Sequence, residues 1–188
     1  MIIDNDFLTK KEQENILDTI KSKNNLFPLH FLPGNVSSDN EDLQEKHYVF
    51  SHVLYYRFAP RSDFYEYFME VFLKFLNKNN IEFRAILSAR VNFYPARAEE
   101  DSIGYPHTDW DFDHKVFLYY INDSDGDTLI YKETVEENIK IENLKNLNVV
   151  KSIKPQMGTG VIFDGKNYHS ASFPIKSKYR AILNVSFL

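Results

Sequence analysis

The sequence predicts a mainly β fold with flanking helices, arranged as a helix-backed β-sandwich or jelly roll. Two helical patterns occur in the first half of the chain, at residues 9–23 and 62–77. Short runs of β-branched and aromatic residues, separated by turn signals, then continue to the end. With 188 residues and no internal repeat or linker, we expect a single domain spanning residues 1–188.

The N-terminal elements follow from local patterns. Ile2 and Ile3 predict a short strand, and Thr9 with Glu12 forms a Thr-x-x-Glu capping box at the start of the first helix. The second helix carries apolar residues at three- and four-residue steps: Phe64, Phe68, Val71, Phe72 and Phe75. We interpret this stripe as core packing against a sheet rather than a cofactor site. Residues 33–46 are rich in Gly, Ser, Asn and acids and predict an exposed loop.

The other strands are predicted from β-branched and aromatic runs bounded by Gly, Pro, Asn and Asp. These runs span residues 48–58, 81–94, 115–121, 128–131, 148–153, 160–163, 168–173 and 179–187. The acidic, Gly-containing segment 122–127 predicts a turn between two strands. Residues 97–102 predict a polar loop, and the charged residues 132–147 predict an insertion with a short helix.

Composition restricts the function classes. The chain has no Cys, so disulfides are excluded and any metal site must use His and carboxylate ligands. A net charge of −5 argues against a broad nucleic-acid surface, because such surfaces neutralise phosphates with Lys and Arg. The N-terminus lacks the basic and apolar regions of a signal peptide, and no apolar run is long enough to span a bilayer. We therefore expect a cytoplasmic enzyme or binding protein without a membrane partner.

A candidate metal site begins in the segment Tyr-Pro-His-Thr-Asp, residues 105–109. In an extended segment His107 and Asp109 point to the same face. We predict His169 as the third ligand, because a late strand of a jelly roll can lie beside an early one. Two imidazoles and one carboxylate form the facial triad of non-haem Fe(II) oxygenases. The alternatives are a solvated acidic turn for the first pair and a hydrogen-bonded core histidine for His169.

The final predicted strand has two different faces. One face is wholly apolar and should pack on the helices: Ala181, Leu183, Val185 and Phe187. The other face directs Arg180 and Asn184 into the barrel. A charged group there is costly unless an anion meets it, and a dicarboxylate co-substrate would supply that anion through a bidentate pair. The alternative for Arg180 is a structural ion pair.

Over most of its length the chain resembles the Fe(II)/2-oxoglutarate dioxygenases, particularly the prolyl-4-hydroxylase-like branch. Its opening Ile-Ile-Asp-Asn-Asp-Phe-Leu-Thr-Lys-Lys-Glu resembles the entry strand and first helix of that branch. The segment Tyr-Tyr-Ile-Asn-Asp followed by Asp-Gly-Asp-Thr, within residues 119–128, is similar to its Tyr-Leu-Asn-Asp…Gly-Gly-Glu-Thr hairpin. The closing pattern repeats in order as Pro155, Gly158, Gly160-Val-Ile-Phe163, His169 and Arg180. The resemblance implies a double-stranded β-helix (jelly roll, cupin-like) backed by two N-terminal helices.

The resemblance also implies roles for individual residues. The implied ligands of Fe(II) are His107, Asp109 and His169. Arg180 is implied as the anchor for the far carboxylate of 2-oxoglutarate. Tyr94, with Asn92 on the same strand face, matches a position that hydrogen-bonds the co-substrate, although core packing would also account for both. The implied activity is that of an oxygenase that uses O2, releases succinate and CO2, and hydroxylates a prolyl or other residue of a protein or peptide, or a small molecule.

Three positions depart from the pattern of that branch. Tyr105 precedes His107 by two residues rather than three, Asp125 replaces the first Gly of the hairpin motif, and Arg180 stands where collagen-type prolyl hydroxylases usually have Lys. The substrate is therefore not implied by the resemblance. Two other functions remain open: a nucleobase-demethylating dioxygenase, because Asn-x-Tyr at 92–94 also resembles alkylation-repair dioxygenases, and a non-catalytic jelly-roll module that binds Zn or Mn.

Overall fold

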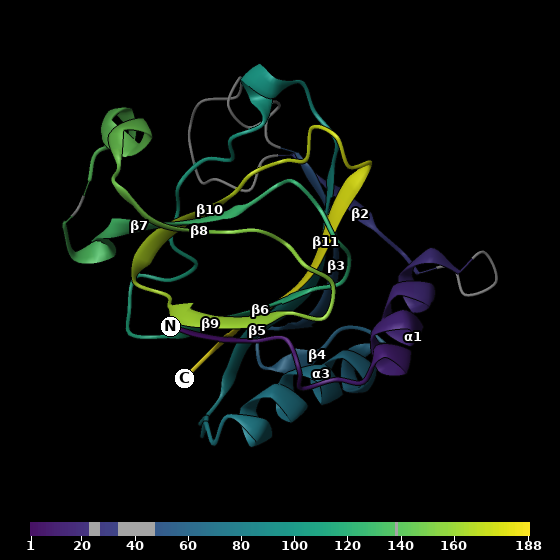
Figure 1. Cartoon of the computed structure of the whole chain (residues 1–188). Helices are drawn as coiled ribbons and strands as arrows, with labels where there is room; N and C mark the ends of the chain where they lie inside the picture. Colours follow the sequence, from purple (N-terminus) through teal and green to yellow (C-terminus); the bar gives the residue numbers. More distant parts are fainter. Residues whose placement is uncertain (23–26, 34–47, 138) are drawn as a thin grey trace.

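The computed structural model of the chain describes residues 1–22, 27–33, 48–137 and 139–188. Two antiparallel sheets face one another, and two α-helices lie beneath the larger sheet (Figure 1). This is the predicted jelly roll backed by helices. The predicted loop at 33–46 lies almost entirely outside the described residues.

The larger sheet contains the two ends of the described chain. Its strands are β1 (Ile2–Asp4), β2 (His30–Leu32), β3 (Val49–Tyr56), β4 (Ala59–Pro60), β5 (Ile86–Pro95), β6 (Lys115–Tyr120), β9 (Gly160–Asp164) and β11 (Tyr179–Phe187). They are ordered β1-β9-β6-β11-β5-β3-β2, with β4 paired to β3. The smaller sheet is ordered β10-β7-β8, and its strands are β7 (Thr128–Thr134), β8 (Val149–Ile153) and β10 (Asn167–Ala171).

Most predicted elements are confirmed with shifted ends, but the predicted strand 48–58 is wrong as a single strand. The chain reverses at Arg57 and Phe58, whose φ angles are 51° and 61°, and Tyr56 pairs with Ala59. Positive φ at both central positions is the type I′ hairpin turn, for which Asn-Gly is the usual signal. The sequence carries no such signal, so the hairpin between β3 and β4 was not predicted.

The predicted strand 81–94 is also shorter than expected, because β5 begins only at Ile86. The amide of Ile81 instead donates to the carbonyl of Leu76 at the end of the preceding helix. Strand β2 was not predicted, and the insertion after β7 contains two short 3₁₀ helices, Val135–Glu137 and Ile141–Asn146. A third 3₁₀ helix, Glu99–Asp101, lies in the predicted polar loop.

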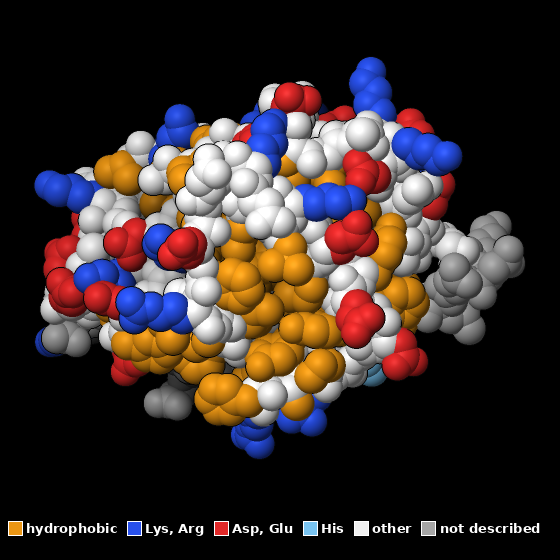
Figure 2. Space-filling view, turned by 90° about the horizontal axis from the view of Figure 1, so that it is seen from below, with side chains coloured by type: hydrophobic (Ala, Val, Ile, Leu, Met, Phe, Trp, Pro, Cys, Tyr) orange, Lys and Arg blue, Asp and Glu red, His pale blue; other side chains and the backbone are white. Residues whose placement is uncertain are grey.

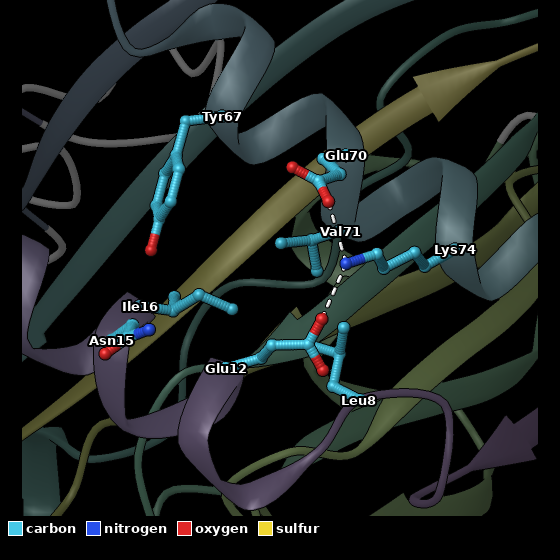
Figure 3. Close-up of a pocket in the computed structure, with 8 residues that line it drawn as sticks. All are labelled: Leu8, Glu12, Asn15, Ile16, Tyr67, Glu70, Val71 and Lys74. Atoms are coloured by element: carbon cyan, nitrogen blue, oxygen red, sulfur yellow. Dashed lines mark hydrogen bonds and ion pairs between the residues drawn. The ribbon is translucent and has the colours of Figure 1, made fainter.

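Both predicted α-helices are present. Helix α1 spans Lys10–Lys21 and starts with the predicted capping box, in which the Glu12 amide donates to Thr9 Oγ1 at 3.3 Å and the Thr9 amide donates to Glu12 Oε2 at 2.7 Å. Helix α3 spans Tyr65–Lys78. Lys74 of α3 joins the helices through an ion pair with Glu12 at 2.6 Å (Figure 3). Neither α-helix of the described part has the length and apolar content needed to cross a membrane.

The apolar residues form two cores on opposite faces of the larger sheet. The outer core lies between the sheet and the helices and contains the aromatic stripe of α3, of which Phe68, Phe72 and Phe75 are fully buried. The apolar face of β11 belongs to this core, as predicted. The inner core lies between the two sheets and includes Ile182 of β11 and Tyr94 of β5. Alternation along β5 and β11 therefore decides which side chains reach the space between the sheets.

Candidate metal centre

The two predicted histidine ligands are paired by the backbone. His107 lies in the segment before β6, and His169 is the third residue of β10. The amide of each histidine donates to the carbonyl of the other at 2.9 Å, which forms an isolated antiparallel β-bridge. The segment that carries His107 thus extends the smaller sheet. Two hydrogen bonds bring together histidines that are 62 residues apart in the sequence.

The predicted carboxylate lies against both imidazoles. Asp109 Oδ1 is 3.9 Å from Nε2 of His107 and 3.9 Å from Nε2 of His169, and the three candidate ligand atoms all lie within 4.8 Å of one another. Metal–ligand distances of about 2.0–2.2 Å allow atoms up to about 4 Å apart to share one ion. Both distances from Asp109 Oδ1 to the imidazole nitrogens fall within this limit.

The orientation of the imidazoles fits metal binding. Nδ1 of His107 lies 3.0 Å from the carbonyl oxygen of Tyr105, and Nδ1 of His169 lies 3.1 Å from that of Asn167. Because a carbonyl only accepts, each Nδ1 carries the proton and each Nε2 presents a lone pair. Nε2 of His169 is buried and has no hydrogen-bond partner among the described residues. A buried acceptor nitrogen without a hydrogen-bond donor is expected of a side chain that coordinates a metal ion.

The electrostatics keep His169 and Asp109 in their ligating protonation states. Burial, together with the charge of His107, lowers the pKa of His169 to about 4, so its imidazole is neutral at pH 7. Burial by itself raises the pKa of Asp109, but the charges of His169 and His107 and a hydrogen bond from Ser186 bring it below its usual value. Asp109 is therefore a carboxylate. A neutral imidazole and an ionised carboxylate are the forms that bind metal.

Ser186 was not identified as a site residue from the sequence. Its hydroxyl donates to Asp109 Oδ2 at 2.8 Å, which leaves Oδ1 facing the two imidazoles. Ser186 lies on β11, on the same strand face as Arg180, so the alternation of this strand was the signal that could have found it. This bond anchors the Asp109 carboxylate to the larger sheet, whereas the two imidazoles that it faces belong to the smaller sheet.

Arg180 is directed between the sheets, as predicted, and is only 1% exposed. Its Nη2 donates to Thr128 Oγ1 at 2.5 Å, and its Nη1 donates to the carbonyls of Asp127 and Ser172, both at 3.3 Å. The guanidinium also lies over the rings of two tyrosines, Tyr94 at 5.1 Å and Tyr120 at 5.7 Å. These contacts fix the side chain in one position.

Among the residues that the structure describes, Arg180 forms no ion pair, and its Nε is buried without a hydrogen-bond partner. A buried charge that is not compensated is strongly destabilising. The structural ion pair considered as an alternative is therefore absent from the described part of the chain. An anionic ligand would supply both the missing charge and an acceptor for Nε.

The predicted co-substrate contacts lie next to Arg180. Tyr94 pairs with Arg180 across β5 and β11 and is 5% exposed. Burial raises the pKa of Tyr94, although the charge of Arg180 and a hydrogen bond from Asn92 act in the opposite direction. Asn92 Oδ1 accepts from the hydroxyl of Ser51 on β3 at 2.7 Å. Both residues face the space between the sheets, and their contact with 2-oxoglutarate stays a prediction.

No family model and no curated protein matches this sequence. Solved structures do match. The non-haem α-ketoglutarate-dependent epimerase SnoN from nogalamycin biosynthesis aligns over 100% of this chain and 77% of its own, with a TM-score of 0.65 and 10% identity. A Pseudomonas putida prolyl-4-hydroxylase aligns over 99% and 91%, with a TM-score of 0.59 and 14% identity.

A prolyl hydroxylase from Trichoplax adhaerens, in complex with a peptide of a hypoxia inducible factor, aligns over 100% of this chain and 82% of its own. Its TM-score is 0.60 and its identity is 15%. Likenesses at such low identity establish the fold. This chain therefore shares the jelly-roll fold of these proteins.

Proposed function

We propose that this chain is a non-haem Fe(II)/2-oxoglutarate-dependent oxygenase that hydroxylates its substrate. Two sets of side chains between the sheets carry the proposal. One is formed by the ligand atoms of His107, Asp109 and His169, and the other is the buried guanidinium of Arg180, which forms no ion pair among the described residues. The fold shared with proteins whose names include this chemistry supports it. A metal-binding module without a co-substrate has no use for a buried, unpaired guanidinium, so Arg180 favours the oxygenase over that alternative.

In this proposal the protein's role is to bind the metal and the co-substrate and to orient them. His107 and His169 present Nε2 lone pairs because their Nδ1 protons are bound by backbone carbonyls, and Asp109 presents Oδ1 because Ser186 holds Oδ2. Arg180 binds the far carboxylate of 2-oxoglutarate. Fe(II) and 2-oxoglutarate, when bound, supply the oxidising chemistry, in which O2 and 2-oxoglutarate give succinate, CO2 and a hydroxylated substrate. No further acid or base is required for that reaction.

The substrate is a prolyl or other residue of a protein or peptide, or a small molecule. The matching structures include one in complex with a peptide and one from nogalamycin biosynthesis, which supports keeping both substrate classes. The net charge of −5 opposes the nucleobase alternative. Succinate release across a panel of peptides, free amino acids, nucleotides and small acids would identify the class.

The proposal is tested by an anaerobic titration with Fe(II) and 2-oxoglutarate. We expect a weak metal-to-ligand charge-transfer absorption in the visible, which His107→Ala abolishes because one of three ligands is lost. Arg180→Gln should retain metal binding but weaken 2-oxoglutarate binding. Absence of the absorption from the parent protein, or equal behaviour of parent and His107→Ala, would refute the proposal.

A further inference from the structure

A second guanidinium reaches the space between the sheets. Arg90 lies on β5, two residues from Asn92 and four from Tyr94, on the same strand face. The intervening residues Ala89 and Val91 belong to the outer core, so Arg90 points away from the helices. Arg90 is half-buried, and its guanidinium carbon lies 6.0 Å from the centre of the Tyr56 ring.

Within the part of the chain that the structure describes, the guanidinium of Arg90 has no acidic partner. In the described residues Arg90 forms no ion pair and no side-chain hydrogen bond, and its Nε is buried without a partner. Its cross-strand neighbour Asn184 likewise has no side-chain hydrogen bond among these residues. A guanidinium with a buried, unpartnered Nε and an adjacent amide on the same strand face leave donors for a ligand with anionic oxygens.

The position of Arg90 relates it to the candidate metal centre. Asn184 is two residues before Ser186, whose hydroxyl holds Asp109. One step of about 7 Å along β11 and one strand spacing of about 5 Å therefore separate the backbone of Arg90 from that of Ser186. The charge of Arg90 is close enough to Tyr94 to act on its hydroxyl, on which the charge of Asp109 also acts. Arg90 thus lies near the proposed reaction centre, one strand beyond Arg180.

Charge balance shows that this residue is not needed for the co-substrate. The two positive charges of Fe(II) and the one of Arg180 are matched by one negative charge on Asp109 and two on 2-oxoglutarate. A site filled in this way is neutral before Arg90 is counted. Arg90 adds a further positive charge that is half-buried and has no acidic partner among the described residues. A negatively charged group on the substrate would compensate it.

On these grounds, and resting on the proposed function, we propose that Arg90, assisted by Asn184, binds a carboxylate of the substrate, so that the enzyme acts on a carboxylate-bearing molecule. A single planar guanidinium matches the two oxygens of one carboxylate, and its single positive charge balances that of a carboxylate, whereas a phosphate monoester at pH 7 carries about −1.5 to −2. The ring of Tyr56 beside Arg90 provides a flat apolar surface for the adjoining part of the substrate.

The experiment measures binding rather than turnover. Protein loaded with Mn(II) and 2-oxoglutarate is titrated calorimetrically with benzoate, benzamide and phenyl phosphate. Benzoate and benzamide have nearly the same shape and differ in charge. We expect benzoate to bind at least tenfold more tightly than benzamide, and Arg90→Gln to remove this preference while Arg90→Lys retains part of it. The matched control is Arg57→Gln, because Arg57 is an exposed arginine 5.4 Å from the same Tyr56 ring.

Equal binding of benzoate and benzamide by the parent, or no binding of either, would overturn the proposal. A preference for phenyl phosphate would overturn the carboxylate assignment. If Arg90→Gln weakens 2-oxoglutarate as much as Arg180→Gln does, Arg90 serves the co-substrate and the proposal is wrong. Failure of the parent to bind Mn(II) and 2-oxoglutarate would instead refute the proposed function, while the comparison of benzoate with benzamide in the metal-free protein still reports on Arg90.

Discussion

At the scale of single residues, the candidate metal centre depends on hydrogen bonds that select one atom of each ligand. Backbone carbonyls bind Nδ1 of His107 and of His169, and Ser186 binds Oδ2 of Asp109. Each of these bonds leaves the remaining ligand atom directed at the same point. Partners of this kind around a metal orient the ligands and raise affinity.

Ser186→Ala removes the hydrogen bond to Asp109 and frees the carboxylate to rotate. We expect metal affinity to fall about 10- to 100-fold, the usual effect of losing such a partner. Titration of the purified variant with Mn(II) or Co(II) measures the change. The fold should be retained, because Ala fits the space that the Ser186 side chain occupies.

Ser88→Ala provides the matched control for this substitution. Ser88 is the cross-strand neighbour of Ser186, is also buried, and forms no side-chain hydrogen bond among the described residues. Its replacement should leave metal affinity unchanged. Equal effects at the two serines would show that the bond to Asp109 does not orient a ligand.

At the scale of elements, the helices are joined to each other by an ion pair as well as by the outer core. Lys74 of α3 contacts Glu12 of α1 at 2.6 Å and Glu70 of its own helix at 2.7 Å, beside a small pocket lined by both helices (Figure 3). Glu12 also accepts from Thr9 at the start of α1. These bonds from Lys74 and Thr9 lower the pKa of Glu12 to about 2.

Glu12→Gln should therefore destabilise the protein in a pH-dependent way. The folded-state pKa is below the ordinary value of 4.5, so the carboxylate contributes stability above pH 4.5 and loses that contribution as the pH falls to about 2. Gln keeps the side-chain acceptor of the capping box, so the substitution tests charge. Urea unfolding of parent and variant should differ most at pH 7 and converge towards pH 2.

Glu70→Gln is the comparison within the same cluster. Glu70 is 62% exposed and pairs with Lys74 across one helical turn, so solvent screens the interaction. We expect a smaller loss of stability than for Glu12→Gln. A difference between the Glu12 variant and the parent that does not change with pH would contradict the assigned role of the charge.

At the scale of the whole molecule, the candidate metal centre connects the two sheets. His107 and His169 belong to the edge of the smaller sheet, whereas Asp109 is held by β11 of the larger sheet. On the opposite side of the larger sheet lie the helices, on a face where apolar side chains gather between charged ones (Figure 2). The inner core and the site occupy the space between the sheets, and the outer core serves mainly to hold the larger sheet in place.

A metal bound between the sheets should stabilise the fold by mass action. At a free Mn(II) concentration 100 times Kd the expected gain is about 2.7 kcal/mol, which for a chain of this size raises Tm by about 5–10 °C. A chelator should reverse the shift. Asp109→Ala should abolish it, whereas His30→Ala, at an exposed histidine on β2, should leave it intact. A Tm that does not respond to metal would argue against the site.

Much of the candidate site could be predicted from the sequence because its signals are local. His-x-Asp fixes two groups on one face of an extended segment, and alternation along the last strand fixes the direction of Arg180. The capping box of α1 and the aromatic stripe of α3 are likewise short-range patterns. Each of these predictions depends on residues only a few positions apart, whose relative geometry the backbone determines.

Other features were decided only by tertiary structure. The bond from Ser186 to Asp109 joins residues 77 positions apart, and no spacing rule connects them. The pairing of Arg90 with Asn184, and the absence of an ion pair at Arg90 among the described residues, depend on which strands become neighbours. The turn at Arg57 and Phe58 is held in positive φ by the strands on both sides. Short-range sequence patterns determined which side chains could serve as ligands. The order of the strands determined which of these side chains lie together between the sheets, because contacts between distant segments form only in the folded protein.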